Sequence, residues 1–284
     1  MEINITSQRV WMITGASRGF GAKIVTAALA AGDAVVATAR NPQSLAEQFG
    51  NHANLLTVAL DVTDEQQAIK AAKAAVERFG RVDILVNNAG YGLLGAVEEA
   101  SNGEVKHQFD TNVFGVLNVT RAVLPHMRAR RAGHIINISS IGGYYAYVGW
   151  GVYGATKFAV EGLTEGLAQE LAPLGIYATV VEPGFFRTDF LEGNSLVSTK
   201  NRIDDYAATV GEMRNFASKV TGQQPGDPDK LAAAFIKLGH TAHPPVRLPL
   251  GTDTISRIAE KHAYVNEELK QWEAVAASTD FAAA

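Results

Sequence analysis

The chain has 284 residues, of which 47% are hydrophobic and 19% are charged, with a net charge of -4 and no cysteine. This composition indicates a globular protein with a large buried core, and it excludes disulfides, thiolate metal sites and a cysteine nucleophile. The basic cluster of Arg128, Arg130 and Arg131 is too small to predict nucleic-acid binding. Because no run of about 18 apolar residues and no leader-like N-terminus is present, we expect a cytoplasmic protein without a membrane partner.

Short apolar segments bounded by turn residues recur along the chain. They span residues 9–14, 34–39, 54–60, 82–87, 133–139, 176–182 and 246–250. They are rich in Val and Ile and nearly continuously hydrophobic, which is typical of parallel strands that are covered on both faces. The pattern predicts a mainly parallel, seven-stranded sheet.

Helix-like segments separate these strands. In residues 64–80, for example, Ile69, Ala72, Val76 and Phe79 recur at a spacing of three to four, and Gly80 ends the segment. The alternation of strands and helices predicts an α/β, Rossmann-type doubly wound fold in a single domain, with helices on both faces of the sheet. In such a fold the ligand site lies at the carboxyl ends of the strands.

The first predicted strand leads into TGASRGFG, residues 14–21, and then into a helix-like segment. In this order, Gly15 allows a tight turn, Gly19 lets the backbone approach a pyrophosphate, and Gly21 lets the helix pack closely on the sheet. The helix N-terminus would bind the anion through its free N–H groups. The stretch therefore predicts a dinucleotide cofactor, with a plain glycine-rich loop as the alternative.

The end of the second predicted strand, ATARNP, bears on which dinucleotide is bound. Enzymes that use NAD commonly carry an acidic residue at this position for the ribose 2′-hydroxyl. Ala39 has no carboxylate, whereas Arg18 and Arg40 offer two guanidinium groups to a 2′-phosphate. We therefore predict NADP(H) in preference to NAD(H), with solvated surface arginines as the alternative.

Four tyrosines gather in GGYYAYVGWGVYGATKF, residues 142–158, and among these four only Tyr153 has a lysine, Lys157, four residues later. On a helix this spacing puts both side chains on one face. Ser140 stands at the end of the strand before them, and Asn112 is a polar residue in an apolar helical run. A carbonyl that accepts hydride needs a proton donor, and the Lys157 ammonium should lower the pKa of the Tyr153 phenol from about 10. Ser140 would donate a hydrogen bond to the same substrate oxygen.

In order and context, Asn112, Ser140, Tyr153 and Lys157 resemble the catalytic tetrad of the short-chain dehydrogenase/reductase family. The G-x-x-x-G-x-G turn, NNAG at 87–90 and VEPGFFRT at 181–188 extend the resemblance over about residues 8–190. Phe20 stands where this family often has Ile or Leu. The resemblance implies that Lys157 also holds the nicotinamide ribose and that Asn112 anchors a proton-relaying water. It further implies a homodimer or homotetramer built from the helices that carry Asn112 and Tyr153.

The resemblance also assigns further cofactor contacts. It places Asp61 and Val62 at the adenine, with Phe186 and Thr188 at the nicotinamide carboxamide. Asp61 is alternatively a helix cap, a role that is open to Thr63 and Asp64 as well. The expected cofactor-binding residues are Gly15, Ser17, Arg18, Gly19, Phe20, Gly21, Arg40, Asp61, Val62, Asn88, Ala89, Gly90, Tyr153, Lys157, Pro183, Gly184, Phe186 and Thr188.

Apolar and aromatic residues near Tyr153 predict the walls of a site for a hydrophobic ketone. Packing in the core or at a subunit interface is the alternative for several of them. Arg187 is a candidate for an anionic group of the substrate. His240 and His243 lack a third ligand nearby, so we expect no metal site and interpret them as loop residues. The expected wall residues are Leu93, Leu94, Tyr144, Tyr145, Tyr147, Trp150, Phe185, Phe190 and Leu191.

The sequence thus predicts an NADPH-dependent carbonyl reductase or secondary alcohol dehydrogenase. A cofactor-binding regulator or scaffold on the same fold is one alternative, and an epimerase, dehydratase or lyase is another. Two segments do not resemble strand-helix units. Residues 190–226 are interpreted as a substrate lid or as a surface excursion without a role, and a C-terminal extension begins at about residue 256.

Overall fold

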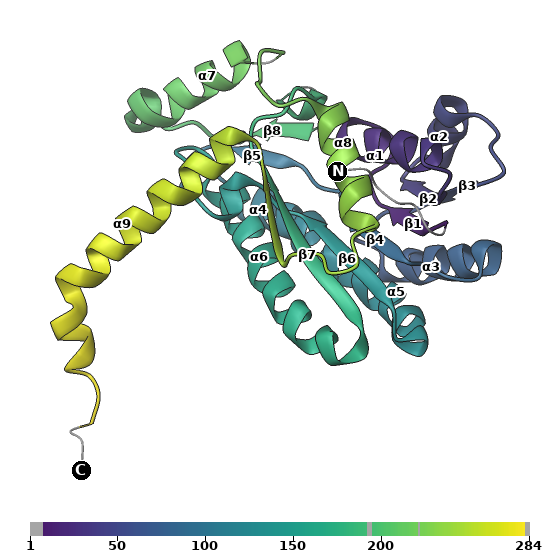
Figure 1. Cartoon of the computed structure of the whole chain (residues 1–284). Coiled ribbons are helices and arrows are strands. Elements are labelled where there is room, and N and C mark those ends of the chain that lie inside the picture. Colours follow the sequence, from purple (N-terminus) through teal and green to yellow (C-terminus); the bar gives the residue numbers. More distant parts are fainter. Residues whose placement is uncertain (1–7, 192–194, 221, 282–284) are drawn as a thin grey trace.

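A parallel sheet with the strand order β3-β2-β1-β4-β6-β7-β9 forms the centre of the molecule (Figure 1). The computed structural model describes residues 8–191, 195–220 and 222–281. The sheet strands are β1 Val10–Ile13, β2 Ala34–Ala39, β3 Leu55–Ala59, β4 Ile84–Asn87, β6 Gly133–Ile138, β7 Ile176–Pro183 and β9 Arg247–Leu250. The predicted seven-stranded, doubly wound sheet is confirmed. The strand order reverses at β1, which pairs with β2 on one side and β4 on the other, so a crevice opens at their carboxyl ends.

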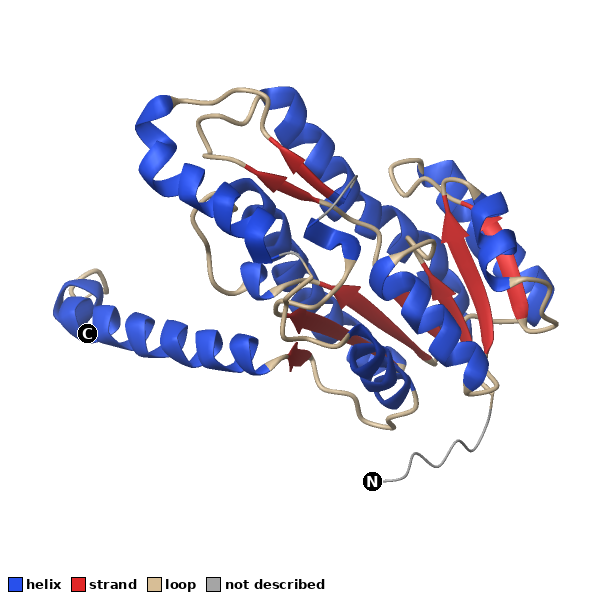
Figure 2. Cartoon of the chain, turned by 90° about the horizontal axis from the view of Figure 1, so that it is seen from above, coloured by secondary structure: helices blue, strands red, loops and turns tan. Residues whose placement is uncertain are grey.

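Helices cover both faces of the sheet (Figure 2). Successive strand residues point to opposite faces, so Trp11 and Ile13 pack into one core and Met12 into the other. Because both faces are covered, the strands are hydrophobic without alternation. One face carries α1 Gly19–Ala30, α2 Pro42–Phe49 and α8 Pro228–Gly239, and the other carries α3 Glu65–Phe79, α5 Gly115–Arg130 and α6 Gly151–Leu171.

The helix predicted over residues 64–80 is α3, and its two ends are set by local sequence. The Asp64 carboxylate accepts hydrogen bonds from the backbone of Gln66 and Gln67, and Gly80 ends the helix in the left-handed region at φ +78°. Asp61 instead accepts from the backbone and hydroxyl of Thr63. Asp64, and not Asp61 or Thr63, is therefore the cap.

Several short elements were not predicted. The strands β5 Gly92–Leu94 and β8 Leu196–Ser198 pair in parallel outside the main sheet. The helix α4 Asn102–Phe109 continues through a π-helical turn, Asp110–Phe114, into α5. Single 3-10 turns occur at Ile141–Gly143, Ala172–Leu174, Asp189–Leu191 and Asp204–Tyr206, and a second π-turn at Ala207–Gly211 leads into α7 Glu212–Val220.

The chain ends in the long helix α9 Thr252–Ala277, which begins beside the sheet and then extends away from it (Figures 1 and 2). The predicted C-terminal extension from about residue 256 falls within this helix. Throughout the described part of the chain, no helix is both long and apolar enough to cross a bilayer.

Candidate active site

Ser140 lies just beyond the carboxyl end of β6, where the chain turns toward α6. Its Oγ accepts a hydrogen bond from the Gly142 backbone over 3.0 Å, which holds the side chain at the start of the turn. Gly142 also lies against the Tyr153 ring, so the turn brings Ser140 close to the first helical turn of α6. The strand end and the helix therefore meet as the sequence predicts.

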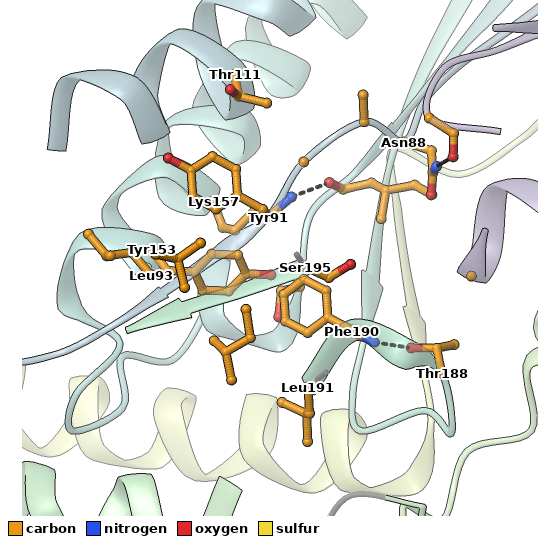
Figure 3. Close-up of a pocket in the computed structure, with 18 of the residues that line it drawn as sticks. Asn88, Tyr91, Leu93, Thr111, Tyr153, Lys157, Thr188, Phe190, Leu191 and Ser195 are labelled. Carbon is orange, nitrogen blue, oxygen red and sulfur yellow. Dashed lines mark hydrogen bonds between the residues drawn. The ribbon is translucent and has the colours of Figure 1, made fainter. Parts of the chain in front are cut away.

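Tyr153 and Lys157 lie on the same side of α6, one turn apart. Both side chains are buried, and the Lys157 Nζ lies 5.7 Å from the centroid of the Tyr153 ring. The Tyr153 ring contacts the rings of Trp150 and Phe190, at centroid distances of 5.6 and 5.9 Å. Figure 3 shows Tyr153 between Leu93 and Phe190, at the wall of one cavity.

The expected lowering of the Tyr153 pKa by Lys157 is not found in this structure. Burial raises the pKa of Tyr153 to about 12, although a hydrogen bond with Ser140 lowers it in part. The prediction was wrong because it counted a neighbouring charge and not the desolvation of the phenolate. The phenol therefore keeps its proton at neutral pH.

Lys157 is oriented by the main chain of β6. Its Nζ donates a hydrogen bond to the Ile138 carbonyl oxygen over 2.8 Å. Burial lowers the pKa of Lys157 to about 8, and the nearby Glu161 carboxylate raises it in part. Lys157 is thus a positioned ammonium at neutral pH that loses its proton more readily than an exposed lysine.

Asn112 occupies the π-helical turn between α4 and α5, and its side chain joins two separate elements. Nδ2 donates to the Tyr91 carbonyl over 2.9 Å and to Thr156 Oγ1 over 3.1 Å, while Oδ1 accepts from the Tyr91 backbone over 3.1 Å. Both amide hydrogens are used, so the side chain fixes the chain after β4 against α6. Asn112 does not line the cleft, and its expected role as a water anchor stays a prediction.

A cleft of about 1390 Å³ at the carboxyl ends of the strands runs from the glycine turn to Tyr153. Apart from Gly21, every residue expected to bind the cofactor lines this cleft. Gly21 lies below the turn, where a Cβ atom would stand 2.4 Å from the Gly15 carbonyl oxygen. Its predicted role, which is close packing of the first helix, agrees with this position.

The glycine turn leaves the start of α1 free to hold an anion. Gly15 and Gly19 adopt φ values of +63° and +54°, a region that disfavours other residues. Arg18 at the N-cap provides no side-chain cap, and the first turn carries no acidic residue. Asn88 braces the turn from β4, donating to the carbonyls of Thr14 and Gly15 over 2.8 and 2.9 Å. The free N–H groups therefore face the cleft.

The end of β2 offers positive charge and no carboxylate. Arg18 and Arg40 are both exposed at the cleft, and neither side chain forms a hydrogen bond or ion pair with any other described residue. Ala39 is buried, and the Asn41 side chain is occupied in capping α2. The end of β2 therefore presents two guanidinium groups to the cleft, and these groups can bind an anionic part of a dinucleotide.

The turn after β7 forms the floor near Tyr153. Pro183, Gly184, Phe186 and Thr188 line the cleft there. The Asp253 carboxylate of α9 accepts a hydrogen bond from the Phe185 backbone over 2.7 Å, and a Cβ atom on Gly184 would lie 2.2 Å from Asp253 Oδ2. Only glycine fits at position 184, because any larger side chain would clash with Asp253. The hydrogen bond from Phe185 to Asp253 joins the turn after β7 to α9.

The predicted lid, residues 190–226, lies over this part of the cleft, and residues 192–194 and 221 fall outside the described residues. Its two ends are joined, since Arg187 N donates to the Gly226 carbonyl and Gly226 N donates to the Phe185 carbonyl, both over 2.9 Å. Met213 and Phe216 of α7 line the cleft, and the Phe216 ring contacts Phe185 at 6.4 Å. Described residues of this segment therefore form part of the cleft wall, while its role as a substrate lid stays a prediction.

Buried Glu99 anchors the lid from below. Its carboxylate accepts hydrogen bonds from the Ile203 and Ala96 backbone over 3.0 and 2.8 Å and pairs with Arg214 over 2.5 Å. Burial alone would raise the pKa of Glu99, but these contacts lower it to about 2. The carboxylate thus stays charged at neutral pH and ties the lid to the chain after β5.

The family model for short chain dehydrogenases matches residues 9–196. The chain belongs to the short-chain dehydrogenase family. It is 37% identical over 266 residues to the 3-ketodihydrosphingosine reductase of Bacteroides thetaiotaomicron, covering 93% of this chain and 96% of that protein. A short-chain dehydrogenase from Streptomyces avermitilis superposes with a TM-score of 0.88 and 42% identity, covering 97% of this chain and 100% of that one. ElxO, solved with NADP bound, superposes with a TM-score of 0.72 and 29% identity, covering 88% of this chain and 100% of the ElxO chain.

The short-chain dehydrogenase is therefore an oxidoreductase. The similarity to the Streptomyces protein extends past residue 190, where the sequence motifs stop, and includes most of the lid and tail. Solved relatives hold NADP in some cases and NADH in others, so family membership alone does not decide the cofactor.

Three of the residues expected to line the substrate site of the dehydrogenase lie outside the cleft. Leu94 is fully buried beneath the cleft, the Tyr144 hydroxyl hydrogen-bonds to His262 of α9, and Tyr145 packs on Tyr147 with centroids 5.2 Å apart. These three residues do not line the cleft: Leu94 belongs to β5 and is packed in the core, whereas Tyr144 and Tyr145, which follow the 3-10 turn after Ser140, contact His262 and Tyr147. The expected residues that do line it are Leu93, Tyr147, Trp150, Phe185, Phe190 and Leu191.

The charged residue at this end of the dehydrogenase cleft is not the expected one. Arg187 is exposed and donates to the Gln224 carbonyl over 3.3 Å, outside the cleft. Arg257 of α9 lines the cleft instead and stacks over the Tyr145 and Tyr147 rings at 5.5 and 6.0 Å. No sequence motif pointed to Arg257, because only the fold brings α9 to the cleft.

A partly buried ionic cluster lies near Lys157 of the dehydrogenase. Arg247 contacts Glu161 over 2.5 Å and Glu165 over 2.7 Å, and it also pairs with Glu182. Glu161 follows Lys157 by one helical turn. Burial raises the pKa of Glu161 to about 8, and the negative charge of the Glu182 carboxylate also raises it. The cluster was missed because its members are far apart in the sequence.

The described residues include no cluster of three His, Asp or Glu side chains suited to a metal. His240 Nε2 lies 2.8 Å from Asp33 Oδ2, which also accepts a hydrogen bond from Trp11 over 2.8 Å, so His240 is a packed core contact and not a plain loop residue. His243 contacts the Tyr177 hydroxyl over 3.2 Å.

Proposed function

We propose that the protein is an NADPH-dependent reductase of ketones that also oxidises the corresponding secondary alcohols. The observation that carries this proposal is the convergence of Ser140, Tyr153 and Lys157 on one wall of a cleft whose other end carries the glycine turn and two unpaired arginines. On this proposal, one cavity holds both the proton donor and the dinucleotide.

NADPH, when bound, supplies the hydride that attacks the carbonyl carbon. As hydride arrives, negative charge develops on the carbonyl oxygen, and Ser140 Oγ donates a hydrogen bond to it. The Tyr153 hydroxyl transfers its proton to the same oxygen. A phenol with a pKa of about 12 is protonated at neutral pH, so Tyr153 carries the proton that the direction of reduction requires. The Lys157 ammonium offers the positive charge that a Tyr153 phenolate requires after the transfer.

The preference for NADP(H) over NAD(H) rests on Arg18 and Arg40. Both guanidinium groups are available, and Ala39 stands where a carboxylate would accept the ribose 2′-hydroxyl of NAD. Asp61 also lines the cleft, but its Oδ1 accepts from Thr63, which reduces its availability to a ribose. NADP bound to ElxO is consistent with this proposal.

The substrate is proposed to be hydrophobic. The part of the cleft beyond Tyr153 is lined largely by aromatic and aliphatic side chains, which favour an apolar ligand. The name of the Bacteroides relative adds 3-ketodihydrosphingosine to the candidates. The residues that form this part are Leu93, Trp150, Phe185, Phe190, Leu191, Leu196, Met213 and Phe216.

A panel of ketones of increasing alkyl and aryl size, including 3-ketodihydrosphingosine, tests the proposal through nicotinamide absorbance with NADPH and NADH in parallel. We expect NADPH oxidation that matches alcohol formation and increases with the apolar area of the ketone. Tyr153→Phe should fold and bind NADPH but lose turnover by about 10²- to 10⁴-fold. Binding of NADPH without oxidation across the panel would support a regulator or scaffold, and product without net oxidation would support an epimerase or dehydratase.

A further inference from the structure

Gln224 is a buried polar residue in the wall of the cleft, and its side chain has no hydrogen-bond partner. The residue is 1% exposed and lines the same cleft as Tyr153. Both its Oε1 and its Nε2 are unpaired. Among the described residues that line the cleft, it is the only one whose buried side chain leaves both an oxygen and a nitrogen without a partner. Such an amide lowers the stability of the folded protein, because it has lost its hydrogen bonds to water.

The backbone around Gln224 is fixed beside the turn that follows β7. The Gln224 carbonyl accepts a hydrogen bond from the Arg187 guanidinium over 3.3 Å. Two residues later, Gly226 forms a parallel bridge with Phe186. The Gly226 N–H donates to the Phe185 carbonyl, and its own carbonyl accepts from Arg187, both over 2.9 Å. Gln224 therefore belongs to the end of the cleft that Phe185 and Phe186 line.

The proposed function requires the nicotinamide ring at this same end of the cleft. Reduction adds a hydride to the carbonyl carbon and a proton from Tyr153 to the oxygen bonded to it, so the ring must lie close to the Tyr153 hydroxyl. Phe190 follows the turn after β7 and contacts the Tyr153 ring at a centroid distance of 5.9 Å (Figure 3). The turn beside Gln224 is thus also the turn next to the proton donor.

The carboxamide of nicotinamide matches the hydrogen-bonding atoms of the Gln224 side chain. Each of the two amides has an oxygen that accepts and an NH2 group that donates, so two facing amides form a pair of hydrogen bonds. A phosphate or a carboxylate cannot donate to Gln224 Oε1, and an apolar substrate would leave both atoms unpaired. Adenine also offers a donor and an acceptor, but the proposed function places it at the opposite end of the cleft.

We propose that Gln224 binds the nicotinamide carboxamide through a pair of amide–amide hydrogen bonds. This inference rests on the proposed function, because it requires a nicotinamide cofactor in the cleft. The flexible Gln224 side chain can turn its amide toward the ligand, whereas its backbone is held in place. The free protein therefore carries an unpaired amide that lowers its stability, and the cofactor gains affinity by supplying the missing partners.

Gln224→Met tests the proposal, because methionine has about the same length and fills the same space without a strong hydrogen-bonding atom. Without cofactor, this variant should be more stable than the wild-type protein, with a Tm that is higher by about 2 °C or more. Its Kd for NADPH, measured by calorimetry, should nonetheless be about 10- to 100-fold higher. Gln223→Met is the matched control, since the neighbouring side chain is exposed and the same change there should leave both values as they are.

The opposite signs of these two effects separate ligand binding from a structural role. An amide that merely supports the fold would lose stability on substitution, so a Gln224→Met chain with a lower Tm, or one that does not fold, would overturn the proposal. Wild-type affinity for NADPH in Gln224→Met would overturn it too and leave the proposed function intact. A wild-type protein that binds neither NADPH nor NADH would contradict the proposed function and this inference together.

A cofactor analogue identifies the group that Gln224 contacts. The 3-acetylpyridine analogue of NADP+ carries a methyl group in place of the carboxamide NH2, so it cannot donate to Gln224 Oε1. We expect the wild-type protein and Gln223→Met to bind this analogue more weakly than NADP+, and Gln224→Met to discriminate between the two about fivefold less. Equal discrimination by the wild-type protein and Gln224→Met would show that Gln224 does not contact the carboxamide.

Discussion

The Lys157 ammonium is joined to the end of β6 by its hydrogen bond with the Ile138 carbonyl, 2.8 Å away. Because this bond and the burial of the side chain fix Nζ near the Tyr153 ring, the charge at this point depends on pH and not on side-chain mobility. Burial lowers the pKa of Lys157 to about 8, so the side chain is mostly protonated below this pH and mostly neutral above it.

We expect kcat/KM for ketone reduction to fall as pH rises through about 8, because this parameter reports groups of the free enzyme and Lys157 loses its charge there. Steady-state rates across the alkaline range check this profile. A wild-type profile that stays flat through this range would contradict the assignment.

The second prediction concerns the ribose end of the cleft. Arg40→Asp replaces an unpaired guanidinium with a carboxylate, which repels a 2′-phosphate and accepts hydrogen bonds from a 2′-hydroxyl. We expect the ratio of kcat/KM for NADPH to that for NADH to fall by about a hundredfold or more. Arg40→Gln is the matched control, because it removes the positive charge without adding a negative one and should give an intermediate ratio. An unchanged preference for NADPH would show that Arg40 does not bind the phosphate.

The strands, the Tyr153–Lys157 pair and the glycine turn could be predicted from the sequence, because each depends on residues that are close together in the chain. The sheet strands were predictable because cover on both faces makes a segment such as Ala34–Ala39 almost entirely apolar, with Thr38 as its one polar residue. The spacing of Tyr153 and Lys157 was readable because helical geometry places such a pair on one side. The glycine turn was readable because its residues must adopt unusual φ values or allow close backbone approach.

The rest of the site depends on contacts between distant segments. Met213 and Phe216 form part of its wall only because the lid folds back over the cleft, and Arg257 reaches it only because α9 packs beside Tyr147. The raised pKa of Tyr153 likewise follows from burial by several elements, which no motif encodes. The three-residue strands β5 and β8 were too short to show a periodic pattern.

The third prediction concerns stability and the buried cluster around Arg247. Glu161 and Glu182 share this guanidinium in the core, so two buried carboxylates face one cation. Burial raises the pKa of Glu161 from 4.5 to about 8, with the Glu182 charge acting in the same direction and Ser139 and Arg247 opposing it. The folded protein therefore holds a proton on Glu161 that the unfolded chain has released.

Between the two pKa values the folded state binds more protons than the unfolded state, so this contribution to stability is complete below about pH 4.5 and is lost as pH rises through about 8. Glu161→Gln cannot titrate and should remove this dependence, which we expect to be on the order of 3 kcal/mol between about pH 5 and pH 8. Urea unfolding of both proteins at these pH values measures the difference in slope. Glu165→Gln removes a half-exposed partner of the same Arg247 and should keep the wild-type slope. An identical pH dependence in Glu161→Gln and the wild-type protein would show that Glu161 carries no proton in the folded state.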